Sequence, residues 1–108
     1  MVIDVDAKKP ILANKIGGIS GPALKPIAVR CIYEIFEEVK IPIIGTGGVT
    51  YGNDAIEMIM AGATAVGIGT AVYYRGIDVF RKVCNEMEVW MKKNKVKSLG
   101  EIKGAAHK

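Results

Sequence analysis

The sequence has few of the residues that build metal sites, disulfides or membrane spans. Its 108 residues include one histidine and two cysteines, Cys31 and Cys84, which lie far apart and form no CxxC pair. A structural zinc site needs about four Cys or His ligands, so no metal site is predicted. No run approaches the roughly eighteen apolar residues of a transmembrane helix, and no basic and then apolar leader opens the chain. We therefore expect a cytoplasmic protein with no membrane span, whose cysteines are free thiols buried in helices.

Basic residues outnumber acidic ones by 15 to 11, which gives a formal net charge of +4. The excess lies near the end of the chain, and residues 51–72 contain no lysine or arginine. Nucleic-acid sites combine basic and aromatic side chains on one surface, and here no aromatic residue interleaves with the terminal lysines. The charge therefore predicts a solvated helix end and no nucleic-acid partner.

Hydrophobic spacing predicts an α/β fold in which helices alternate with short buried strands. Apolar residues recur every three or four positions in the predicted helices and form unbroken runs in the strands. We predict an extended strand or arm at 1–6, helices at 27–40, 53–62 and 78–94, strands at 41–46 and 63–68, and a short helix at 99–102, with Asn53 or Asp54 capping the second helix. This order indicates parallel βαβ units, and two or three such strands would form an incomplete sheet.

Each predicted strand ends in a turn of small residues that could bind phosphate. Gly47-Gly48 follows the first and Gly69-Thr70 the second, one βα unit later. Glycine lets backbone N–H groups approach an anion, and the loops after neighbouring parallel strands meet at one face. The loop 17–26 (GGISGPALKP) also leads into a helix. The alternatives are ordinary tight turns and a surface loop, and neither a GxGxxG nor a P-loop motif is present.

The runs NKIGGISGPALKPIAVR, IPIIGTGGV, AIEMIMAGATAVGIGTA and SLGEIKG together resemble the closing part of dihydroorotate dehydrogenases, in particular the class 1, type B enzymes. The resemblance implies that residues 1–108 are the carboxy-terminal part of a TIM (β/α)8 barrel. The parent enzyme would use FMN to oxidise dihydroorotate to orotate in pyrimidine biosynthesis, with an iron-sulfur FAD subunit as electron-transfer partner. The FMN contacts it implies are Gly21, Gly47, Gly48, Gly69 and Thr70.

The resemblance implies no catalytic residue in this chain. The family's base and its flavin-holding and orotate-holding lysine and asparagine residues would precede residue 1, so we expect the isolated chain to be inactive. Neither the two cysteines nor Asn14 matches those positions. Lys15 and Lys25 flank the glycine loop. Each could be either a solvated surface lysine or a ligand for an anion. His107, near the terminus, is expected to be idle.

Two alternatives to this assignment remain open. One is a self-associating half-barrel that binds a phosphorylated ligand without catalysis, for which a compact dimer with a cooperative melt would be the evidence. The other is the related FMN domain of dihydropyrimidine dehydrogenase, which shares the GGxSG and glycine-pair pattern. As a fragment, the chain would pair with a complementing amino-terminal fragment or with another copy of itself.

Overall fold

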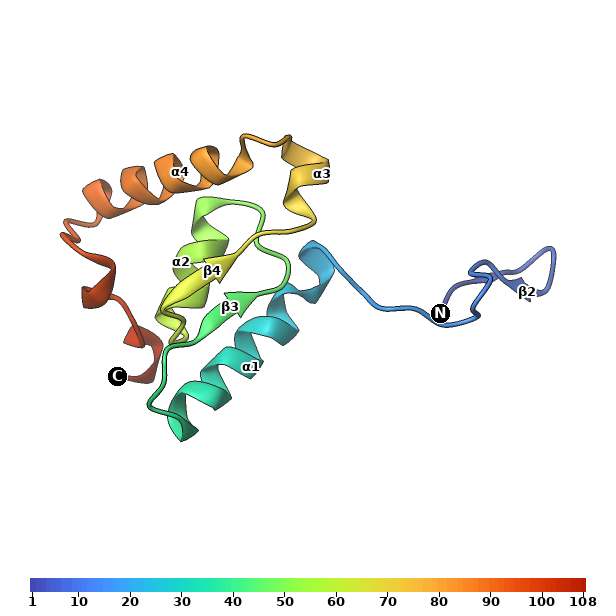
Figure 1. The fold of residues 1–108 in the computed structure, drawn as a ribbon, viewed down its shortest axis with the longest axis horizontal. Helices are drawn as coiled ribbons and strands as arrows, with labels where there is room; N and C mark the ends of the chain where they lie inside the picture. The colour runs from blue at the N-terminus through green and yellow to red at the C-terminus, as the bar shows by residue number, and fades with distance from the viewer.

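A computed structural model describes all 108 residues, which form an amino-terminal arm and an α/β body (Figure 1). In the arm, β1 (Ile3–Asp4) pairs antiparallel with β2 (Lys9–Pro10). The Asp4 carboxylate accepts hydrogen bonds from the N–H groups of Asp6 and Ala7 at 3.0 and 2.9 Å, an Asx turn that reverses the chain. The predicted extended arm is confirmed, but the hairpin was not foreseen. Every residue from 1 to 20 is exposed.

The body alternates helices with two parallel strands. β3 (Ile44–Thr46) pairs with β4 (Ala65–Gly67), with Ile44 opposite Ala65. The helices are α1 (Lys25–Glu38), α2 (Gly52–Met60), α3 (Ala71–Arg75) and α4 (Val79–Lys93), with 3-10 turns η1 (Pro22–Leu24), η2 (Leu99–Glu101) and η3 (Ala105–His107). The predicted order of elements is confirmed, including the short helical turn near Leu99. The separate helix α3 was not predicted.

The core lies between the sheet and the helices, on one face of the sheet. A Cβ added at Gly45 in β3 would lie 2.8 Å from Ile32 of α1 and 3.3 Å from Met58 of α2. Val66 of β4 packs against the buried pair Ile56 and Ile59 of α2. The opposite face has no such cover, and Ile44 there is 71% exposed. The two strands therefore have one packed face and one open face.

Two local expectations were wrong. Cys31 and Cys84 are both exposed, because each lies beside the covered stripe of its helix and only the neighbouring Ile32 and Val83 are buried. The cap of α2 is Tyr51, and Asp54 lies inside the first turn, where its carboxylate accepts a hydrogen bond from the Tyr51 N–H at 2.8 Å.

None of the helices combines the length and apolar character that a membrane span demands.

Candidate functional site

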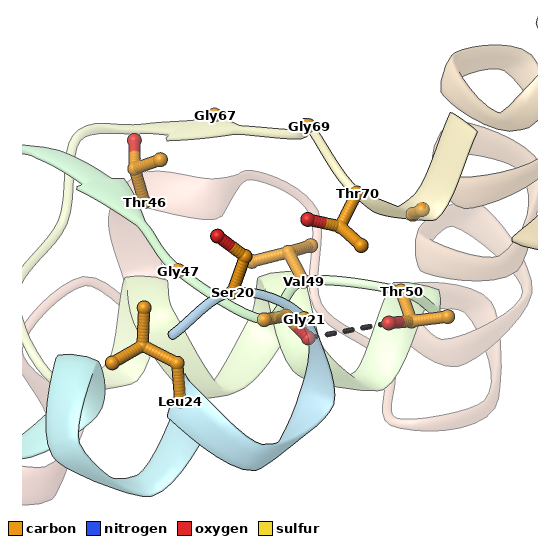
Figure 2. A pocket seen from close by; sticks show the side chains of 12 residues that line it. Ser20, Gly21, Leu24, Thr46, Gly47, Val49, Thr50, Gly67, Gly69 and Thr70 are labelled. Atoms are coloured by element: carbon orange, nitrogen blue, oxygen red, sulfur yellow. Dashed lines mark hydrogen bonds between the residues drawn. The ribbon is translucent and has the colours of Figure 1, made fainter. Parts of the chain in front are cut away.

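The three glycine loops identified in the sequence meet in one pocket of about 260 Å³ beyond the carboxyl ends of β3 and β4 (Figure 2). All five residues proposed from the sequence line it. Its walls are otherwise made of small, uncharged side chains, and the lining consists of Ser20, Gly21, Leu24, Thr46, Gly47, Gly48, Val49, Thr50, Gly67, Gly69, Thr70 and Ala71. The structure thus brings the predicted residues together, while their contact with FMN stays a prediction.

The turn after β3 is packed so closely that only glycine fits there. Gly47 and Gly48 have φ angles of +132° and +76°. A Cβ at Gly48 would lie 2.7 Å from the Lys25 Cβ and 2.8 Å from the Gly21 carbonyl oxygen. The turn therefore lies directly against the loop that leads into α1. The Thr50 hydroxyl donates a hydrogen bond to the Gly48 carbonyl oxygen at 3.2 Å, drawn as the dashed line in Figure 2.

The turn after β4 has open space beside Gly69. A Cβ at Gly69 would meet no heavy atom within 4 Å. Thr70 caps α3 and leads straight into it at Ala71. Gly21, with φ of +86°, approaches this turn from the third loop, and a Cβ there would lie 3.5 Å from Thr70 Cγ2. Each of the three loops therefore adjoins another one around the pocket.

Five residues that line the pocket have backbone N–H groups with no acceptor in the chain. The N–H groups of the five predicted residues, Gly21, Gly47, Gly48, Gly69 and Thr70, donate to no backbone or side-chain oxygen of the chain. Unsatisfied N–H groups that converge near a helix start are typical of anion sites, because they supply partial positive charge without a cationic side chain. Main-chain N–H groups of this kind are the donors that a phosphate group would require.

Lys25 does not serve the pocket as an anion ligand. Its ammonium group lies 2.8 Å from the Asp54 carboxylate and 2.7 Å from that of Glu57, and it is absent from the pocket lining. Hydrogen bonds to Asp54 and Glu57 raise the pKa of Lys25 above its ordinary value. Burial raises the pKa of Asp54, but hydrogen bonds from Lys25 and from the Tyr51 and Thr50 N–H groups outweigh it and leave that pKa lowered. Lys15 lies in the exposed arm.

A second ion pair behind the pocket was not found from the sequence. Arg75, at the end of α3, pairs with Glu86 of α4 and donates a hydrogen bond to the Thr50 carbonyl oxygen at 2.7 Å. The hydrogen bond from Arg75 holds the pKa of Glu86 below its usual value. The pair is separated by a helix break at Gly76, so no helical spacing connects the two residues in the sequence. No sequence signal could have identified it.

Comparison with known proteins gives a consistent result. A family model described as dihydroorotate dehydrogenase matches residues 1–91. The chain is 53% identical over 107 residues to the dihydroorotate dehydrogenase B (NAD(+)) catalytic subunit of Methanocaldococcus jannaschii, and 48% identical over 108 residues to that of Pyrococcus furiosus. The matches include 99% and 100% of this chain, but only 35% and 36% of the two relatives.

A solved structure agrees with the sequence matches. Ligand-free dihydroorotate dehydrogenase of Eimeria tenella superposes with a TM-score of 0.81 and 31% identity, over 90% of this chain and 28% of that one. The chain therefore spans about a third of the length of the curated relatives it matches, and about as much of this structural neighbour.

Proposed function

The chain belongs to the dihydroorotate dehydrogenase family, and from that premise we propose that it binds the phosphate group of FMN. Residues 1–108 would be the last βα units of a TIM (β/α)8 barrel. The observation that carries the proposal is that five residues lining one pocket have backbone N–H groups without acceptors. Phosphate sites of such barrels lie in the loops after the last two strands, which is where β3 and β4 would be placed.

The pocket would offer a phosphate dianion main-chain donors and no charged side chain. Its lining contains no acidic, basic or thiol side chain. A bound phosphate would be held by the N–H groups of the two strand-end turns and by the start of the η1 and α1 helical segment beyond Gly21. Gly69 lines the pocket, and a methyl group there would meet open space, so we propose that glycine leaves room for the ligand.

The activity we propose for the complete enzyme is the oxidation of dihydroorotate to orotate in pyrimidine biosynthesis. FMN, when bound, would accept the hydride. The residues of this pocket would bind and orient the cofactor, and since none of them can titrate near neutral pH, they would not remove the substrate proton. We assign no catalytic residue to the chain.

The relatives also suggest a partner and a location. The matched proteins are named as catalytic subunits of the type B, NAD(+) enzyme. We propose that the complete enzyme passes electrons to an iron-sulfur FAD subunit in the cytoplasm. The open face of the sheet, with Ile44 71% exposed, supports covering by further barrel strands.

A titration with two flavins tests the phosphate site directly. We expect the chain to bind FMN and to bind riboflavin, which lacks the phosphate, at least ~10-fold more weakly, a difference of about 1.4 kcal/mol. Flavin fluorescence would report both affinities, and inorganic phosphate should compete with FMN. Equal affinity for the two flavins, or no binding of either, would remove the proposal.

The open sheet face also favours a second candidate, a half-barrel that associates with another copy and holds a phosphorylated ligand without catalysis. β3 and β4 form a sheet of two strands, so each strand also has one unpaired edge, and such edges are a known route to association. Sedimentation of the chain would separate the two: a compact dimer with one cooperative melt supports the module, whereas a monomer supports a barrel segment that needs the remaining strands.

A further inference from the structure

The segment Thr50–Gly52, directly beyond the pocket turn, is held mainly by side chains. The N–H groups of Thr50 and Tyr51 donate to the Asp54 carboxylate at 2.9 and 2.8 Å. The Gly52 N–H donates to the Glu86 carboxylate at 2.6 Å, and the Thr50 carbonyl accepts from Arg75. Glu86 and Arg75 lie 34 and 25 residues away along the chain from the groups they bind. Long-range contacts therefore set the position of this segment.

Arg75 connects the two strand-end turns from behind. It ends the five-residue helix α3, which starts immediately after Thr70 of the second turn. Its guanidinium reaches back to Thr50, two residues beyond Gly48 of the first turn, and lies 4.4 Å from the centre of the Tyr51 ring. The Lys82 ammonium donates to the Arg75 carbonyl oxygen at 2.8 Å and fixes the end of α3.

Glu86 anchors this arrangement to the longest helix. Glu86 Oε1 accepts a hydrogen bond from Arg75, and Oε2 accepts from both the Gly52 N–H and Arg75, so the side chain joins α4 to α3 and to the start of α2. The approach is close, because a Cβ at Gly52 would lie 2.8 Å from the Met87 backbone nitrogen. The Arg75 side chain is 17% exposed and that of Glu86 is 36% exposed. The ion pair is therefore only partly exposed to water.

We propose that Arg75 and Glu86 are positioning residues for the phosphate pocket, locking the turn after β3 to the turn after β4. The inference rests on the proposed function, because the turns it fixes carry the N–H groups assigned to phosphate. Neither residue lines the pocket, so neither would touch the ligand. They act by setting the separation of Gly48 and Gly69, on which simultaneous donation to one phosphate depends.

The test compares Arg75→Gln and Glu86→Gln with Arg81→Gln. Arg81 is a matched control on α4, because its side chain is 76% exposed and pairs only with Asp78. We expect either test variant to weaken FMN binding ~10-fold, about 1.4 kcal/mol, while riboflavin affinity stays unchanged. The double variant should lose no more than the single ones, since the pair acts as one unit. General unfolding would instead lower the affinity for both flavins.

Ligand-free spectra keep this test separate from the proposed function. In ¹H–¹⁵N spectra of the chain alone, Arg75→Gln should shift the amide resonances of both Gly48 and Gly69. If Arg75→Gln does not fold, Arg75→Lys replaces it in the test. Lysine keeps the charge but loses the planar fork of the guanidinium, so both resonances should still shift, by small amounts. A wild-type chain that does not bind FMN would refute the FMN assignment and would leave the positioning role to be decided by the spectra. The positioning role would be overturned if the test variants left the Gly48 amide resonance unshifted. It would also be overturned if the wild-type chain bound FMN and the variants bound it within ~2-fold of the same affinity.

Discussion

The Nε2 atom of His107 lies 3.0 Å from the carbonyl oxygen of Ala61, 46 residues earlier in the chain. Ala61 caps the carboxyl end of α2, and the imidazole ring stacks on Tyr33 of α1 at 3.8 Å between ring centres. The side chain is only 14% exposed. The expectation of a frayed terminus was wrong, because the last turn folds back over the ends of two helices and His107 makes structural contacts there.

Replacing His107 should destabilise the body. His107→Ala removes one hydrogen bond and one stacked ring, and we expect a loss of about 1–2 kcal/mol in the free energy of unfolding. Urea denaturation followed by circular dichroism would measure it. Lys108→Ala, at the exposed neighbouring position, is the control and should leave the denaturation midpoint unchanged. Equal midpoints for both variants would mean that the tail does not hold the helices.

A methyl group at Gly69 should weaken ligand binding without disturbing the fold. The added Cβ would meet open space, and no positive φ is required there. Gly18→Ala is a matched control, because it also adds a methyl to open space but lies outside the pocket. We expect FMN affinity to fall at least ~10-fold in Gly69→Ala alone, about 1.4 kcal/mol, with melting temperatures of both variants near wild type. Undiminished FMN binding by Gly69→Ala would place the phosphate elsewhere.

Stability should fall in acid because of Asp54. Its pKa is lowered in the folded chain, so its contribution is present above the unfolded pKa of about 3.9 and is lost as pH falls through the folded value. Asp54→Asn should cost about 1.5–3 kcal/mol at pH 7, because charged hydrogen bonds to two N–H groups and to Lys25 are lost or weakened.

Chemical denaturation between pH 7 and pH 3 would measure the acid effect. The wild-type chain should lose stability below about pH 4, and Asp54→Asn should show a smaller loss over the same range. Parallel curves for the two proteins would assign the acid sensitivity to other carboxylates, of which Glu86 also has a lowered pKa.

Local patterns in the sequence were enough to predict the alternating elements and the glycine turns. The apolar runs at 41–46 and 63–68 predicted β3 and β4, and the spacing of Gly47 and Gly69 predicted that their loops meet. Burial was predicted less well. A helical period identifies an apolar stripe but not which part of it is covered, and Ile27 and Ile35 of α1 are 56% and 45% exposed. The sheet covers only the part of the stripe around Ile32.

The groups that fix the pocket from behind could not be predicted for a different reason. Asp54 was expected as a cap for α2, but it binds the Thr50 and Tyr51 N–H groups from inside the first turn and also pairs with Lys25 of α1. Arg75 and Glu86 meet because a helix break redirects the chain between them. Such contacts depend on tertiary placement, which neither residue type nor spacing encodes.

The pairing of β3 with β4 also has a consequence for the order of folding. Ile44 pairs with Ala65 only 21 positions later (65 minus 44), with α2 and two short loops between them, whereas His107 contacts Ala61 across 46 residues. Because the entropy cost of closing a loop grows with its length, the strand-helix-strand unit should form first and the tail should dock last. Pulse-labelled hydrogen exchange should therefore show protection of α2 amides before those of η3.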